Sequence, residues 1–110
     1  MKLIDRSTLR TKLGRATLVE ALPEKYYREG HLPGAKHLPH DQVRLLAPAV
    51  LPDNDAEIVV YCASSTCQNS HIAAQVLEQL GYTHVAVYAG GKQDWQEAGL
   101  ALEREAVQPA

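Results

Sequence analysis

The sequence predicts an α/β fold, a three-layer sandwich in which helices cover both faces of a central, mainly parallel sheet. Two short apolar runs, 58–61 (IVVY) and 85–88 (VAVY), are typical of strands that are buried on both faces. Between them, apolar residues recur at helical spacing, and Gly81 follows as a helix stop. A strand, a helix and a strand in succession form a βαβ unit, whose strands lie parallel.

Weaker signals upstream and downstream continue the same alternation of strands and helices, with Pro and Gly residues marking the turns. Further strands are expected at 2–4, 16–22 and 36–38. Further helices are expected at 7–13, 24–28, 42–47 and 92–98. Together with the βαβ unit, these segments indicate one continuous sheet with helices on both sides.

The bulk composition indicates one ordinary globular domain. A chain of 110 residues has room for one modest core, so we expect a single domain over 1–110, with its core at about 3–100 and a C-terminal tail at 101–110. Lys and Arg total 11 against 13 Asp and Glu, which gives no electrostatic reason to expect nucleic acid or a membrane as partner. The N-terminus turns charged at Asp5 and Arg6, so we expect no signal peptide and a cytoplasmic location.

Cys62 directly follows the predicted strand 58–61. Ligands of open parallel sheets bind at the carboxyl ends of the strands, where loop amides and helix N-termini converge. We expect these groups to lower the pKa of the Cys62 thiol and to stabilise a thiolate, a persulfide or a bound oxyanion. Cys62 is therefore our candidate nucleophile, and the alternative is an inert thiol in the core.

The segment after Cys62 is rich in hydroxyl and amide groups, which suits an anion-binding loop and also any surface loop. The candidate substrate-binding residues are Ala63, Ser64, Ser65, Thr66, Gln68, Asn69 and Ser70. Asn69 or Ser70 is expected to cap the following helix. Cys67 lies in the same segment, and three roles stay open for it: resolving a persulfide or sulfenate on Cys62 as a disulfide, acting as the nucleophile, or having no part.

Four motifs, in order from about residue 18 to residue 100, resemble the signatures of rhodanese domains. They are 30–35 (GHLPGA) with Leu38 and Pro39, 58–62 (IVVYC), Gly81 with Tyr82, and Gly90–Gly91 with Trp95, Gly99 and Leu100. The resemblance implies a five-stranded parallel sheet, with Cys62 as the active cysteine. It also implies transfer of sulfane sulfur through a cysteine persulfide to a thiol, cyanide or protein acceptor. The expected partners are thus a small sulfane-sulfur donor and that acceptor.

Two departures from the family pattern bear on the substrate. An Asp-x-Arg pair of the family corresponds here to Glu20 and Leu22, so we expect that ion pair to be missing. The loop after Cys62 reaches its helix about two residues later than in the family and contains neither Arg nor Lys. A neutral loop binds dianions poorly, so we expect persulfides or polysulfides, rather than thiosulfate, as donors.

The sequence leaves three functions to compare. The first is a sulfurtransferase or sulfur carrier; the second is a non-catalytic or redox-regulatory module on the same fold. The third, a phosphatase or arsenate reductase, needs a cation in the loop, and the loop has none. The His and Cys spacing fits no metal-ligand pattern, so we expect no metal and no cofactor, and packing roles for His31 and His37.

Overall fold

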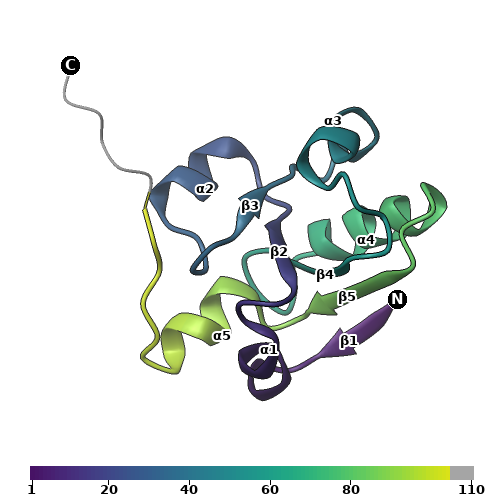
Figure 1. Ribbon diagram of the computed structural model, residues 1–110. Coiled ribbons are helices and arrows are strands. Elements are labelled where there is room, and N and C mark those ends of the chain that lie inside the picture. Colours follow the sequence, from purple (N-terminus) through teal and green to yellow (C-terminus); the bar gives the residue numbers. More distant parts are fainter. Residues whose placement is uncertain (105–110) are drawn as a thin grey trace.

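The computed structural model describes residues 1–104, in which five strands alternate with five helices (Figure 1). The strands are β1 (Lys2–Ile4), β2 (Thr17–Glu20), β3 (Lys36–His37), β4 (Glu57–Tyr61) and β5 (His84–Tyr88). The helices are α1 (Arg6–Lys12), α2 (Glu24–Glu29), α3 (Val43–Val50), α4 (Asn69–Gln79) and α5 (Gly91–Glu97). All neighbouring strands pair in parallel, in the order β1-β5-β4-β2-β3, which confirms the predicted five-stranded parallel sheet.

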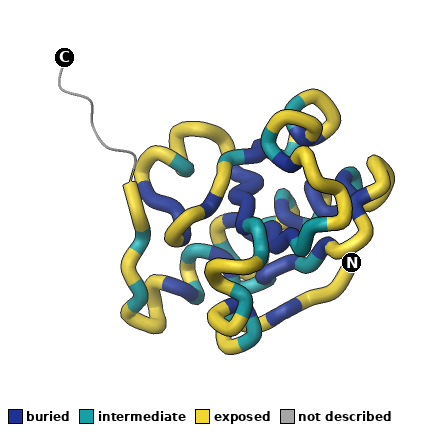
Figure 2. The backbone as a smooth tube through the Cα atoms, viewed as in Figure 1, coloured by how far each residue is buried: buried dark blue, intermediate teal, exposed yellow. Residues whose placement is uncertain are grey.

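Helices cover both faces of this sheet, and each face has its own apolar core. Successive side chains of a strand point to opposite faces. In β4, Ile58 and Val60 pack against residues of α3 and α4, whereas Val59 and Tyr61 pack with residues of α1 and α5. Figure 2 shows that the buried backbone is concentrated in the central strands, beneath a largely exposed outer layer. The predicted three-layer arrangement is therefore confirmed.

Helix α4 follows the sequence prediction in its middle and at its end. Ala73 and Leu77 of the predicted apolar stripe are fully buried, whereas Ile72 and Leu80 at its two ends are exposed. Gly81 has a φ of +97°, and the amide of Tyr82 donates to the carbonyl of Leu77 at 3.1 Å. This is the left-handed helix ending that glycine favours.

Helix α3 and the C-terminal segment extend further than the sequence predicts. Pro48 lies inside α3. The helix continues past this proline, since the amide of Leu51 donates to the carbonyl of Ala47 at 2.7 Å. Glu103 pairs with His31 as an antiparallel bridge, so residues 101–104 are held against the domain. The rest of the predicted tail, 105–110, lies outside the described residues. In the described part, no helix has both the length and the apolar character required to cross a membrane.

Candidate active site

Cys62 lies at the carboxyl end of β4, the strand in the middle of the sheet, between β5 and β2. The residues that follow, 63–68, form the Cys62 loop, which leads into α4. Cys62 itself is 1% exposed, whereas Cys67 in the loop is half-buried. The sequence-based placement of Cys62 at a strand end is therefore what the structure shows, but its sulfur is covered.

The thiol of Cys62 is held between the loop and the first turn of α4. Its Sγ donates toward the carbonyl oxygen of Cys67 at 3.4 Å and toward the hydroxyl oxygen of Ser70 at 3.3 Å. The amide of Cys67 donates to the carbonyl of Ser64 at 3.1 Å, which turns the loop back over Cys62. Cys67 and Ser70 thus both contact the buried sulfur, one through its backbone and the other through its side chain.

Burial raises the pKa of the Cys62 thiol, and the neighbouring Cys67 side chain raises it further. The hydroxyl and the backbone amide of Ser70 act in the opposite direction, because both donate to the thiolate. The net direction is the reverse of the lowered pKa expected from the sequence. The strand-end position is right, but the side chain lies deep enough that desolvation outweighs the donors at the helix start.

The N-terminus of α5 fixes the backbone of Cys62 from the other side. The amides of Lys92 and Gln93 donate to the carbonyls of Cys62 and Ala63 at 3.0 and 2.9 Å. Gly91 makes this approach possible, because a Cβ at this position would lie 2.4 Å from the Cys62 carbonyl oxygen. Gly91 is therefore a point of close backbone approach between the end of β4 and the start of α5.

A buried ion pair that was not predicted from the sequence lies beside this contact. Glu20, fully buried at the end of β2, lies 3.0 Å from the ammonium group of Lys92 and accepts a hydrogen bond from the Tyr61 hydroxyl at 2.8 Å. Lys92 also donates to the carbonyl of Tyr26 at 2.7 Å. Leu22 has no part in this pair, so the ion pair of the family pattern is missing as expected, and Glu20 pairs with Lys92 instead. A single charged residue in the apolar run 16–22 was the available signal.

The predicted substrate-binding residues do not form one continuous surface. Ala63, Ser65, Thr66 and Gln68 are exposed, whereas Ser64 and Asn69 are half-buried. Ser70 is 2% exposed and lies within α4. Gln68 occupies the position before α4 and makes no side-chain cap, so neither Asn69 nor Ser70 caps the helix as predicted. The hydroxyl of Ser70 is instead turned toward Cys62.

The histidines of the first signature make packing contacts, as expected. His31 stacks on Tyr27 with ring centroids 4.0 Å apart, and His37 stacks on the same tyrosine at 4.8 Å. His31 Nδ1 lies 2.9 Å from the Tyr27 carbonyl, and His37 Nε2 lies 2.6 Å from that of Leu22. Among residues 1–104, no three His, Cys, Asp or Glu side chains are grouped so that they would hold a metal ion.

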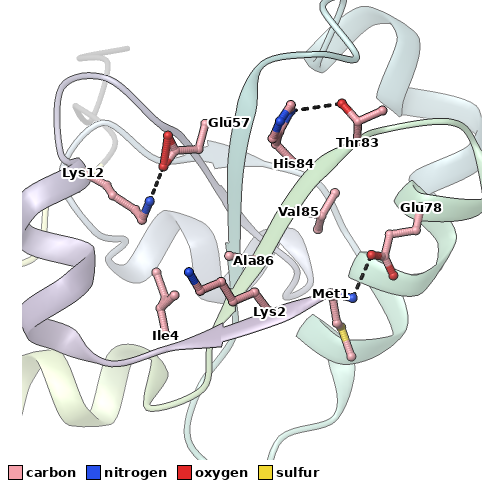
Figure 3. A pocket seen from close by; sticks show the side chains of 10 residues that line it. All are labelled: Met1, Lys2, Ile4, Lys12, Glu57, Glu78, Thr83, His84, Val85 and Ala86. Atoms are coloured by element: carbon pink, nitrogen blue, oxygen red, sulfur yellow. Dashed lines mark hydrogen bonds and ion pairs between the residues drawn. The ribbon is translucent and has the colours of Figure 1, made fainter.

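A surface hollow opens at the other end of the sheet, around the first residues of β1, β4 and β5 (Figure 3). Lys12 and Glu57 in its wall form an ion pair with each other. The amino group of Met1 lies 2.8 Å from the Glu78 carboxylate. Because these charges neutralise one another and the hollow lies far along the strands from Cys62, we assign it no part in the chemistry.

Comparison with known proteins agrees with this geometry. The model of the rhodanese-like domain family matches residues 5–98. The chain belongs to this family. The thiosulfate sulfurtransferase PspE of Escherichia coli K12 is 36% identical to this rhodanese-like domain over 73 residues, which are 66% of this chain and 66% of that protein. An HTH-type transcriptional regulator of Mycobacterium tuberculosis is 30% identical over 97 residues, 88% of this chain and 42% of the regulator.

The solved structure of the human single-domain sulfurtransferase TSTD1 is also similar to this rhodanese-like domain. The two share 26% identity and a TM-score of 0.77, over 88% of this chain and 96% of the human one. The chain spans 66% and 42% of the lengths of the bacterial relatives, PspE and the regulator, respectively. The domain is thus homologous to thiosulfate sulfurtransferases.

Proposed function

We propose that this rhodanese-like domain is a sulfurtransferase that carries sulfane sulfur as a persulfide on Cys62. The observation that carries the proposal is the setting of Cys62: its backbone is fixed by the start of α5, and its sulfur faces the hydroxyl and amide of Ser70. Such donors stabilise a thiolate and equally a terminal persulfide anion. Homology to thiosulfate sulfurtransferases supports the same reaction class.

The reaction has two steps. The Cys62 thiolate attacks the terminal sulfur of a persulfide donor, forms a Cys62–S–SH group, and expels the rest of the donor as a thiolate. An acceptor such as cyanide then attacks the outer sulfur, leaves as thiocyanate, and returns the Cys62 thiolate. Sulfur moves as a neutral atom in both steps, so no separate oxidant or reductant is needed.

The electrostatics of the loop favour persulfides or polysulfides as donors. The Cys62 loop has no cationic residue, and the ammonium group of nearby Lys92 is already paired with the buried carboxylate of Glu20. Thiosulfate carries two negative charges and would find no cation to offset them. We expect sulfur uptake from polysulfide to be faster than uptake from thiosulfate at equal concentration.

Intact-protein mass spectrometry tests the proposal. The reduced chain is incubated with polysulfide, freed of excess reagent and weighed, and cyanide is then added to measure thiocyanate. The Cys67→Ser variant is expected to gain one sulfur atom and to yield thiocyanate, whereas the Cys62→Ser variant gains none. If Cys62→Ser gains sulfur and Cys67→Ser does not, Cys67 is the nucleophile. If neither single variant gains sulfur, the domain is not a sulfur carrier.

A further inference from the structure

We propose that Cys67 resolves the persulfide on Cys62, so that the domain releases the transferred sulfur as hydrosulfide and closes a disulfide between the two cysteines. This inference rests on the proposed function, because the persulfide must first form on Cys62. It adds a second activity to the domain, the reductive release of sulfide. The co-substrate class that it requires is an external dithiol.

The Cys62 loop holds Cys67 directly against the buried sulfur. The Cys67 carbonyl oxygen lies 3.4 Å from the Sγ of Cys62, and the turn closed by Ser64 fixes that position. The side chain of Cys67 also acts on the Cys62 thiol, because it contributes to raising the pKa of Cys62. A thiol on a residue whose backbone already contacts the reacting sulfur has the advantage of proximity over any thiol that must arrive from solution.

The two cysteines differ in access, and this difference decides which acceptor has the advantage. Cys62 is 1% exposed, so a second protein or thiol must displace the loop to reach its sulfur. Cys67 lies in the loop itself and is half-buried, so it meets solvent on one side and Cys62 on the other. After the donor has left, attack by Cys67 needs no second opening of the loop.

Leaving-group chemistry selects the inner sulfur as the point of attack. In thiol–disulfide exchange, the sulfur whose conjugate acid has the lower pKa leaves faster. Attack on the outer sulfur would expel the Cys62 thiolate, which burial makes a poor leaving group. Attack on the inner sulfur expels hydrosulfide, the conjugate base of a stronger acid than a buried thiol. The expected products are therefore the Cys62–Cys67 disulfide and sulfide.

The cycle balances with a dithiol as reductant. The Cys67 thiolate forms a bond to the Sγ of Cys62 while the bond between that sulfur and the outer sulfur breaks, and the electron pair departs with hydrosulfide. A dithiol then attacks the accessible sulfur of Cys67, forms a mixed disulfide, and closes its own disulfide to restore both thiols. In sum, one persulfide and one dithiol give one thiol, one sulfide and one disulfide.

Sulfide release from the loaded protein, without added thiol, tests the inference. Wild type, Cys67→Ser, and a Cys67→Ser/Ser65→Cys double variant are loaded with polysulfide, freed of reagent and followed over time. Wild type is expected to release about one sulfide per chain and to lose reaction with alkylating agents at both cysteines. Cys67→Ser is expected to keep its sulfur until cyanide is added. The double variant moves the thiol to position 65, which is exposed, and so tests whether any thiol in the loop is sufficient. It is expected to release sulfide more slowly than wild type.

The outcomes separate this inference from the proposed function. If wild type keeps the extra sulfur as long as Cys67→Ser does, the resolving role is overturned while the sulfur carrier stands. If the extra sulfur moves to Cys67 without release of sulfide, the resolving role is likewise overturned. If Cys67→Ser takes up no sulfur at all, the proposed function fails and the inference fails with it.

Discussion

The surroundings of Cys62 contain groups that favour its thiolate and groups that favour its neutral thiol. Its location at the end of β4 and the donors of Ser70 favour the thiolate, but desolvation and the side chain of Cys67 favour the neutral thiol. The second pair of effects prevails, so the resting form near neutral pH is the thiol. Cys62 must therefore lose its proton before it can react as a nucleophile, and the pH dependence of that step is measurable.

The alkylation rate of Cys62 should report its raised pKa. In a Cys67→Ser background, only Cys62 reacts, and its rate is expected to keep rising with pH beyond the range of an ordinary thiol. The reason is that the thiolate is the reacting species and burial moves its appearance to higher pH. A plateau below the ordinary thiol range would contradict the raised pKa.

Replacing Ser70 in that background should shift the same profile further. Ser70→Ala removes a hydroxyl that favours the thiolate, so the profile moves to higher pH and the rate at neutral pH falls by a factor on the order of ten. This estimate takes about 1.5 kcal/mol for a hydrogen bond to a charged group. Ser65→Ala is the control, because Ser65 is exposed, and it is expected to leave the profile unchanged. Equal effects of both substitutions would show that the Ser70 hydroxyl does not specifically stabilise the Cys62 thiolate.

At the scale of elements, Cys62 is positioned by pieces of chain that are distant in sequence. The start of α5 binds the backbone that follows β4, and the side chain of Lys92 binds Glu20 at the end of β2. The pair is buried, which makes it different from the more exposed, half-buried pair formed by Arg6 and Asp94. Removing one partner of a buried pair leaves an uncompensated charge, whereas exposed pairs contribute little.

Lys92→Met is expected to lower the free energy of unfolding by about 3 to 5 kcal/mol, because it leaves the Glu20 carboxylate buried without a counter-charge. The Glu20→Gln/Lys92→Met double variant should recover most of this loss, since neither charge remains. Urea denaturation measures both. Arg6→Met is the matched control and should cost less than about 1 kcal/mol. A Lys92→Met variant no less stable than Arg6→Met would show that the pair has no such role.

At the scale of the whole molecule, one sheet joins two separate cores. Val19, Val60 and Val87 belong to the core beneath α3 and α4, whereas Val59 and Trp95 belong to the core beneath α1 and α5. Because the strands contribute side chains to both, neither core is expected to survive loss of the other. The domain should therefore unfold as one cooperative unit.

This cooperativity can be checked by following urea unfolding with two probes. Trp95, the single tryptophan, reports on one core by fluorescence, and far-UV circular dichroism reports on helices of both faces. The two transitions should coincide. Leu77→Ala in the other core should shift both equally, with a loss of about 2 to 5 kcal/mol. Leu45→Ala, at an exposed position, should change little. Separate transitions would contradict a single unit.

Local sequence patterns were enough to predict the fold class and the position of Cys62 at the end of a strand. Local periodicity is enough to recognise the apolar runs 58–61 and 85–88 and the helical stripe between them. It does not require knowledge of which segments pack together. The position of Cys62 follows from them, because the end of a parallel strand is a place that the chain order specifies. The helix boundaries were less well predicted, as at Pro48, where one lost hydrogen bond does not end the helix.

The environment of Cys62, by contrast, depends on how distant parts of the chain pack around it. The direction of the pKa shift depends on how deeply the sulfur lies, and depth results from the packing of the loop, α4 and α5 together. The ionic partner of Glu20 is Lys92, a residue brought near by the order of strands in the sheet and not by any spacing in the chain. Charge pairing between distant residues and desolvation both depend on which residues lie close together in space. A single sequence does not specify those residues.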